Sequence, residues 1–169
     1  KGVEVSVFGS PVQSKDFTWT ININFARNRN KVVRLFEGAD NLVLADFQGG
    51  VSLNATLGQP YGEIRGSDYV YFNDSKSPAN RIVGANGRYL VSSNANIVIG
   101  NANPDWTGGI SNTVKYKNFS LSFLIDTRQG GDLFSLDQFY GQGTGIYPET
   151  VLLNDLGNPS RDPVASGGG

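Results

Sequence analysis

Apolar residues recur at every second position along two stretches of the chain. From Phe17 to Phe25, five apolar side chains alternate with Thr and Asn over nine positions without a break, and Phe119 to Ile125 carries a second apolar series of the same period. Successive side chains of a strand point to opposite sides, so each stretch predicts a strand with one apolar face. The apolar set consists of Phe17, Trp19, Ile21, Ile23, Phe25, Phe119, Leu121, Phe123 and Ile125.

Each strand has an alternating partner that a short polar segment joins to it. The first predicted hairpin spans residues 3–30, with a turn at residues 11–16. The second spans residues 109–128, and only Lys117-Asn118 lies between its arms, which is the length of the tightest hairpin connection. The sequence therefore predicts an all-β chain of antiparallel strands.

The rest of the chain lacks such alternation. Residues 31–108 and 129–169 are rich in Gly, Asn and Pro, so we expect two long loop regions there. The G-x-G-x-G sequence at Gly141–Gly145 has no alternating strand before it and no helical pattern after it. We interpret it as a plain loop and not as a phosphate site.

Two architectures explain strands of this kind. A soluble β-sandwich has a polar face that borders water, and alternation alone fits it well. A transmembrane barrel strand needs about 9–11 residues, and its aromatic side chains gather where the strand meets the membrane interface. Phe17 and Trp19 lie next to the predicted turn, where such a girdle would be placed.

Composition removes several classes of function. The 169 residues contain neither Cys nor His, so disulfides, thiolate chemistry and the usual neutral-pH acid or metal ligand are absent. We expect no cofactor, no metal and no enzymatic activity, since no catalytic constellation is present. A net charge of −1 provides no basic surface for nucleic acid. No apolar run approaches the roughly 18 residues of a membrane helix.

Two sequence tracts, compared residue by residue, give a sharper indication of fold and function. The first tract comprises Asn103-Pro104-Asp105-Trp106, Gly109-Ile110, Asn112, Tyr116-Lys117-Asn118-Phe119, Leu121-Ser122 and Gly130-Gly131. The second comprises Gly2-Val3-Glu4, Phe17, Trp19, Asn24-Phe25, Asn28, Asn30 and Lys31-Val32, with Val3 in place of the more usual Ile. Both resemble the C-terminal barrel of the SusC/RagA family of TonB-dependent outer-membrane transporters, and they occur in the family's order.

The resemblance implies a fold and a location. Residues 1–169 would be an internal fragment of a barrel of about 22 strands, with the lumen-filling plug domain outside the fragment. The nine apolar residues of the two strands would face the lipid bilayer of a Gram-negative, Bacteroidetes-like outer membrane. The two long loop regions would lie outside the cell, and the short turns in the periplasm.

The resemblance also implies a function and partners. Members of the family import complex nutrients, glycans in most cases and peptides in some. A SusD-like surface lipoprotein covers the barrel mouth, and the TonB complex supplies energy through parts of the protein that this chain does not contain. The alternative from another class is a soluble extracellular β-sandwich, a carbohydrate-binding or adhesin module, which requires Trp19, Phe25 and Phe123 to be buried in a closed core.

Overall fold

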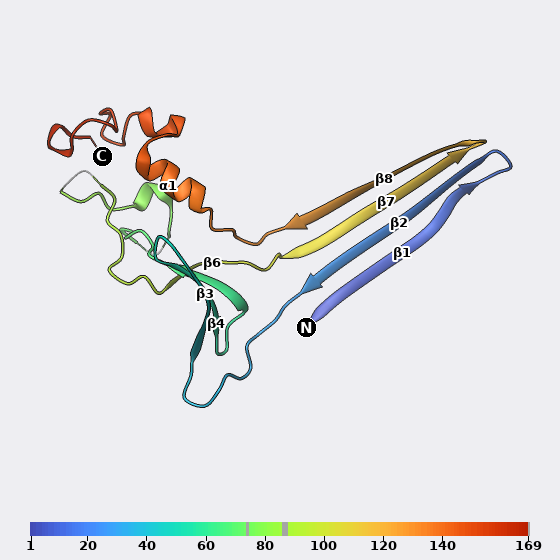
Figure 1. The fold of residues 1–169 in the computed structure, drawn as a ribbon, viewed down its shortest axis with the longest axis horizontal. Helices are drawn as coiled ribbons and strands as arrows, with labels where there is room; N and C mark the ends of the chain where they lie inside the picture. The colour runs from blue at the N-terminus through green and yellow to red at the C-terminus, as the bar shows by residue number, and fades with distance from the viewer. Residues whose placement is uncertain (74, 86–87, 169) are drawn as a thin grey trace. The chain divides into compact units, whose positions relative to one another are not determined.

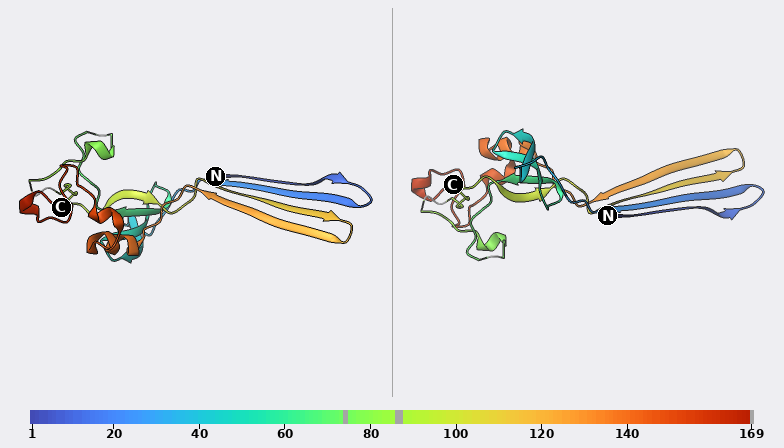
Figure 2. Two further views of the ribbon diagram at one scale, coloured as in Figure 1. Left: turned by 90° about the horizontal axis from the view of Figure 1, so that it is seen from above. Right: turned by 90° about the horizontal axis from the view of Figure 1, so that it is seen from below.

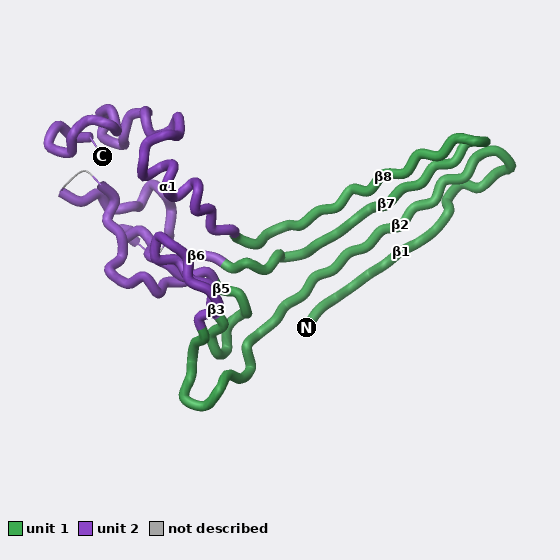
Figure 3. The backbone as a smooth tube through the Cα atoms, viewed as in Figure 1, with its two compact units in different colours: residues 1–42, 55–63, 101–132 green, residues 43–54, 64–100, 133–169 purple. Residues whose placement is uncertain are grey.

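The computed structural model describes residues 1–73, 75–85 and 88–168 (Figure 1). Its strands form two sheets of four strands, in the orders β1-β2-β7-β8 and β3-β4-β5-β6. The chain divides into two compact units (Figure 3). Unit 1 comprises Lys1–Leu42, Ala55–Glu63 and Asn101–Asp132, and unit 2 comprises Val43–Asn54, Ile64–Gly100 and Leu133–Gly169.

The first sheet, which we call the long sheet, lies entirely in unit 1. Its strands are β1 (Gly2–Gln13), β2 (Phe17–Asn28), β7 (Trp106–Tyr116) and β8 (Phe119–Gln129). All three pairings are antiparallel, and the four strands lie side by side in every view (Figure 2). The predicted all-β fold with antiparallel strands is confirmed.

Two tight turns lie at the same end of the long sheet. Between β1 and β2, the Ser14 amide donates to the Phe17 carbonyl at 2.7 Å. Between β7 and β8, Lys117 adopts the left-handed conformation with φ 51°, which a two-residue hairpin turn requires of a central residue. The Lys117 amide donates to the Asp16 carbonyl at 2.8 Å, so the two turns are neighbours.

The two regions expected to be long loops contain regular structure. The second sheet consists of β3 (Asn41–Phe47), β4 (Val51–Thr56), β5 (Tyr61–Gly66) and β6 (Ile97–Asn101). These strands have only five to seven residues, too few for a clear alternation signal. Among the described residues there are also three short 3-10 helices, at Pro78–Asn80, Pro148–Val151 and Val164–Ser166.

Helix α1 (Leu136–Thr144) replaces the loop predicted at Gly141–Gly145, so that interpretation is wrong. Ser135 caps the helix, because its side chain accepts a hydrogen bond from the Gln138 amide. Gly145, with φ 74°, ends the helix in the left-handed conformation. Gly141 is buried, and the Tyr147 ring occupies the space that a Cβ atom would need.

Very little of the described chain is a conventional core. The buried apolar residues are Val51, Ala55 and Ile64, none of which belongs to the long sheet. In unit 2, α1 packs through aromatic contacts: the Phe134 ring lies 6.3 Å from Phe47 and 6.1 Å from Phe139 between centroids. Within the described residues, no helix is both long and apolar enough to cross a membrane.

One polar side chain is buried among the apolar residues of the long sheet. Asn112 is 8% exposed, and its amide oxygen accepts a hydrogen bond from the Trp19 indole nitrogen at 3.2 Å. Trp19 pairs with Val114 across β2 and β7, so this bond runs diagonally between neighbouring rows. A slip of two residues would keep every side chain on its face but would break this bond. The pair therefore selects one register among those that the alternation permits.

We expect Trp19→Phe and Asn112→Leu to couple strongly. Trp19→Phe leaves the buried Asn112 without its partner, and Asn112→Leu leaves the half-buried Trp19 indole without its partner. Each single change should destabilise the protein by about 1–3 kcal/mol, while the double change removes both groups and should cost less than the sum. Urea unfolding of the full-length protein measures the cycle. Thr20→Val, which removes only the exposed hydroxyl contact with Ser10, is the control; additive single effects would contradict the role of the pair.

Candidate functional site

All nine apolar residues singled out in the sequence lie on one face of the long sheet, which we call the apolar face. Register fixes this, because residues paired across antiparallel strands point to the same side. Phe17, for example, pairs with Tyr116, which pairs with Phe119. The rows that follow join Trp19 to Leu121, Ile21 to Phe123 and Ile23 to Ile125, each through one residue of β7.

The apolar face is open to its surroundings. Phe119, Leu121 and Ile125 are 79%, 63% and 59% exposed, and Val3, Val5 and Val7 extend the same face over β1. Near its other end the rings of Phe25 and Trp106 lie 5.8 Å apart. An exposed apolar surface of this extent is unusual for a protein surrounded by water and is typical of a surface that contacts another protein surface or a membrane.

The opposite face of the long sheet is polar and almost uncharged at its centre. It carries Thr and Asn from β2 and Ser from β8, and hydroxyl pairs cross it: Thr113 with Ser122 and Ser10 with Thr20, both at 3.0 Å. Two large apolar side chains interrupt it, Phe8 and Leu124. Such a face can hydrogen-bond to water, to a polar solute or to another polar protein surface.

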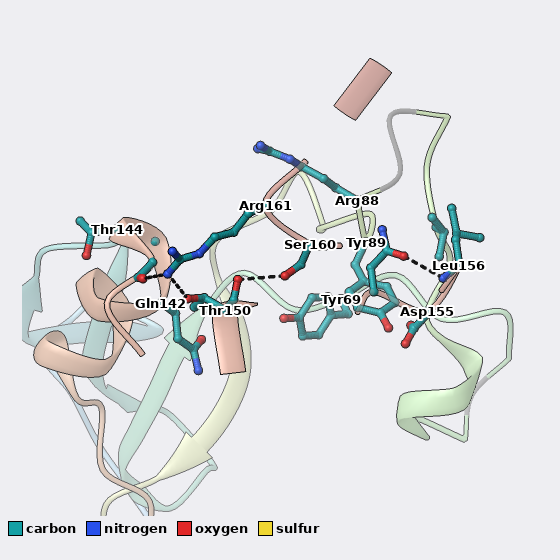
Figure 4. Close-up of a pocket in the computed structure, with 14 residues that line it drawn as sticks. Tyr69, Arg88, Tyr89, Gln142, Thr144, Thr150, Asp155, Leu156, Ser160 and Arg161 are labelled. Atoms are coloured by element: carbon teal, nitrogen blue, oxygen red, sulfur yellow. Dashed lines mark hydrogen bonds between the residues drawn. The ribbon is translucent and has the colours of Figure 1, made fainter. Parts of the chain in front are cut away.

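A separate hollow lies within unit 2, with a volume of about 880 Å³. Figure 4 shows its residues, which come from segments near residues 69, 89, 145 and 155. The lining combines aromatic rings, amide and hydroxyl groups and charges of both signs. Residues of each kind include Tyr69, Tyr89, Gln142, Thr150, Asp155 and Arg161.

The two tyrosines of the hollow are held by an arginine. The rings of Tyr69 and Tyr89 meet edge to face, 5.5 Å apart, and the Arg81 guanidinium carbon lies 4.3 Å from the Tyr69 ring centre and 5.4 Å from that of Tyr89. The Nε atom of Arg81 is buried without a hydrogen-bond partner in the described structure, and the two rings give its guanidinium cation–π contacts. Neither tyrosine hydroxyl is hydrogen-bonded within the described residues, which leaves both for a ligand.

Another wall of the hollow is formed by the C-terminal part of the chain. The Arg161 guanidinium donates to the Gly145 carbonyl and, at 3.2 Å, to the Thr150 hydroxyl (Figure 4). The Ser160 hydroxyl donates to the Thr150 carbonyl at 2.9 Å. These bonds tie the segment after α1 into one wall, and they leave the Asp155 carboxylate exposed beside it.

Asp68 anchors the loop that leads into Tyr69. Its carboxylate accepts hydrogen bonds from the Lys76 ammonium at 2.7 Å and from the Tyr69 amide at 2.8 Å. The Lys76 hydrogen bond is the main reason that the pKa of Asp68 lies below its ordinary value of 3.8. A lowered carboxyl pKa stabilises the fold above that ordinary value, and this contribution is lost as the pH falls through the folded pKa.

The hollow was missed by sequence analysis because the residues that line it lie far apart in the sequence. It can stack a ring against tyrosine and hydrogen-bond to hydroxyl or amide groups, which suits a polar ligand. Its residues lie far apart in the sequence, from 69 to 161, on short segments without a periodic signal. The sequence contains the Tyr, Arg and Asp residues of this region, but their spacing matches no motif that would predict a common site.

Relatives of the chain are known. It is 29% identical over 179 residues to TonB-dependent receptor P3 of Formosa agariphila, with 95% of the chain and 18% of the relative aligned. It is 30% identical to the TonB-dependent receptor SusC of Bacteroides thetaiotaomicron, with 98% of the chain and 17% of the relative aligned. It is 26% identical to TonB-dependent receptor P26 of Formosa agariphila, over 99% of the chain and 19% of that relative.

No family model matches the chain. Among solved structures, one described as the structure of the RagAB peptide transporter shares 23% identity and a TM-score of 0.49, with 74% of this chain and 14% of that chain covered; this likeness is too weak to bear on function. The chain spans less than a fifth of the length of the three receptors above. The resemblance predicted from the two sequence tracts is confirmed, and the chain is homologous over nearly its whole length to a segment of the TonB-dependent receptors, a group that includes SusC.

Proposed function

We propose that this chain forms part of the wall and of the outward-facing segments of a TonB-dependent importer in the bacterial outer membrane. The observation that carries the proposal is the open apolar face of the long sheet, with Phe119 79% exposed and Leu121 63% exposed. Its strands have 11 or 12 residues, enough for a tilted strand to cross the hydrocarbon layer. In this role the nine apolar residues contact lipid, and the polar face lines the lumen.

Connection length supports a proposed side of the membrane for each end of the long sheet. Barrels of this class have short turns on the periplasmic side and long connections outside. The two neighbouring turns, at Ser14–Asp16 and Lys117-Asn118, are then periplasmic. The second sheet, α1 and the hollow of unit 2 belong to the extracellular segments. In this proposal the hairpins predicted at residues 3–30 and 109–128 form the barrel wall. The long regions between and after them form the outer segments.

The whole importer extends beyond this chain. Because the related receptors are more than five times longer, the plug and the segment that contacts TonB would come from elsewhere in the protein. A SusD-like surface lipoprotein is the proposed partner on the outside, by analogy with the family. Nucleic acid has no place in this function, and we assign no enzymatic step to the chain.

For the nutrient we propose a glycan that contacts the hollow of unit 2. Saccharides present hydroxyl groups and apolar ring faces together, and the hollow offers both complements through Tyr69 and Tyr89 and through the polar groups around them. A peptide is the second candidate, since amide groups would also find partners there. The hollow does not depend on the long sheet, so the two parts of the proposal can be tested separately.

The runner-up, a soluble β-sandwich, requires a closed core around the apolar face. Phe25 and Phe123 are 37% and 47% exposed, and the described residues of the long sheet include no buried apolar side chain. This exposure argues against the sandwich and for an apolar environment outside the chain.

Charge placed on the two faces of β8 tests the membrane assignment. We expect Phe123→Arg to reduce assembly of the full-length protein sharply, because an arginine at the lipid face near the bilayer midplane costs about 2–4 kcal/mol. Ser122→Arg, at the adjacent position on the polar face, is the matched control and should assemble nearly normally. The shift of the folded barrel on unheated gels measures assembly, and equal loss for both variants would remove the support for lipid on the apolar face.

Removal of the two tyrosine hydroxyls tests the glycan contact. Tyr69→Phe with Tyr89→Phe keeps both rings, and therefore the contacts with Arg81, while it removes two hydrogen-bonding groups. At about 1 kcal/mol for each hydroxyl, affinity for a bound oligosaccharide should fall about 30-fold. Isothermal titration of the full-length protein measures this. Phe72→Ala, which removes an exposed ring that does not line the hollow, should have no effect; unchanged binding by the double variant would exclude the hollow as the glycan site.

A further inference from the structure

Two asparagine side chains, one from each family-like sequence tract, hold the backbone of a single residue, Tyr61. The Tyr61 amide donates to the Asn30 side-chain oxygen at 2.7 Å. The Tyr61 carbonyl accepts from the Asn103 side-chain nitrogen. All three residues belong to unit 1, so their arrangement is defined within one compact body. We call Asn30 and Asn103 the amide clamp.

The Asn103 half of the clamp is itself fixed by a polar network. Both the backbone and side-chain nitrogens of Asn103 donate to the Asn101 side-chain oxygen, each at 2.8 Å. Asn101 is tied in turn to Asp132: its amide donates to the Asp132 carboxylate at 2.8 Å, and the Asp132 amide donates to its carbonyl at 2.7 Å. Orientation of the Asn103 amide is thereby set, with the nitrogen toward Tyr61.

The chain next to Tyr61 is held in the same way. The Gly62 carbonyl accepts from the Ala102 amide at 2.9 Å. Gly62 has φ 85°, and a Cβ atom there would approach the Asn103 side-chain nitrogen to 3.2 Å. The start of β5 therefore passes close over the segment that leads into β7, and the absence of a side chain at residue 62 permits this approach.

We propose that the amide clamp is a positioning device: it fixes the start of β5 against the end of the long sheet opposite the two tight turns. The proposal rests on the proposed function in one respect, since β5 belongs to the segment between β2 and β7 that carries Tyr69 and Tyr89. Asn30 and Asn103 act through the Tyr61 backbone. This gives Asn30 and Asn103, conspicuous in the sequence, a specific physical role.

The two halves of the clamp use opposite ends of the amide group. Asn30 acts as an acceptor, so an aspartate in its place can still accept from the Tyr61 amide. Asn103 acts as a donor toward two oxygens, those of Tyr61 and Asn101. An aspartate at residue 103 has no proton to donate and would place a negative charge against both oxygens. The same chemical change should therefore be tolerated at one position and harmful at the other.

Hydrogen exchange at the start of β5, measured by mass spectrometry on the full-length protein, tests this asymmetry. We expect Asn30→Asp to exchange like the wild type, and Asn103→Asp to exchange about tenfold faster or more. Asn103→Ala, which removes the donor without adding charge, should show a smaller increase, and it serves if Asn103→Asp fails to assemble. Equal exchange in Asn30→Asp and the assembled Asn103 variants would overturn the proposal.

Uptake kinetics separate positioning from simple stability. In barrels that assemble normally, the Asn103 variants should raise the half-saturation concentration of nutrient uptake several-fold with little change in the maximal rate, and Asn30→Asp should not. Faster exchange with unchanged uptake would show that the clamp does not position the nutrient contacts, and would overturn the proposed link between the clamp and nutrient binding. The exchange readout does not require transport, so a failure of the importer proposal would leave the asymmetry intact and is distinguishable.

Discussion

Backbone hydrogen bonding in the long sheet is the interaction on which the rest of the structure depends. Because β1, β2, β7 and β8 pair in antiparallel register, with one register shift between Gly9 and Val12, side chains from the four strands fall into rows, and successive rows point alternately to the apolar face and to the polar face. No helix or second layer is needed to produce this division. It follows from pairing and from the period of two along each strand.

The same hydrogen-bonded sheet has unpaired edges and an uncovered apolar face, and its own four strands cannot cover them. Within the described residues β1 and β8 are edge strands, each with one row of unpaired amide and carbonyl groups, and the apolar face has no layer packed on it. Further strands at both edges and lipid on one face would meet these requirements together. The buried Trp19–Asn112 hydrogen bond fits this environment, because a polar group on such a face needs a partner within the chain.

Structure that depends on local sequence patterns was predicted well, and structure that depends on contacts between distant residues was not. The alternation from Phe17 to Phe25 and from Phe119 to Ile125 is enough to predict which side chains share a face of the sheet. The connection at Lys117-Asn118 is short enough to fix the pairing of its two strands. Strands β3 to β6 have too few residues to show a clear alternation of apolar and polar side chains. Helix α1 was missed because two glycines interrupt its pattern, although Ser135 and Gly145 supplied both caps. The hollow at Tyr69 and Tyr89 depends on contacts across long sequence distances, which local patterns do not record.

The central claim is that lipid contacts one face of the long sheet and not the other. These 169 residues contain no cysteine, so in an assembled protein without other cysteines, single cysteines can be introduced along β8 from residue 119 to residue 125 and labelled with an environment-sensitive fluorophore. Quenching by a lipid-confined quencher should alternate, strong at residues 119, 121, 123 and 125 and weak at the residues between them. Quenching that does not alternate, or that is strongest at residues 120 and 122, would contradict the account.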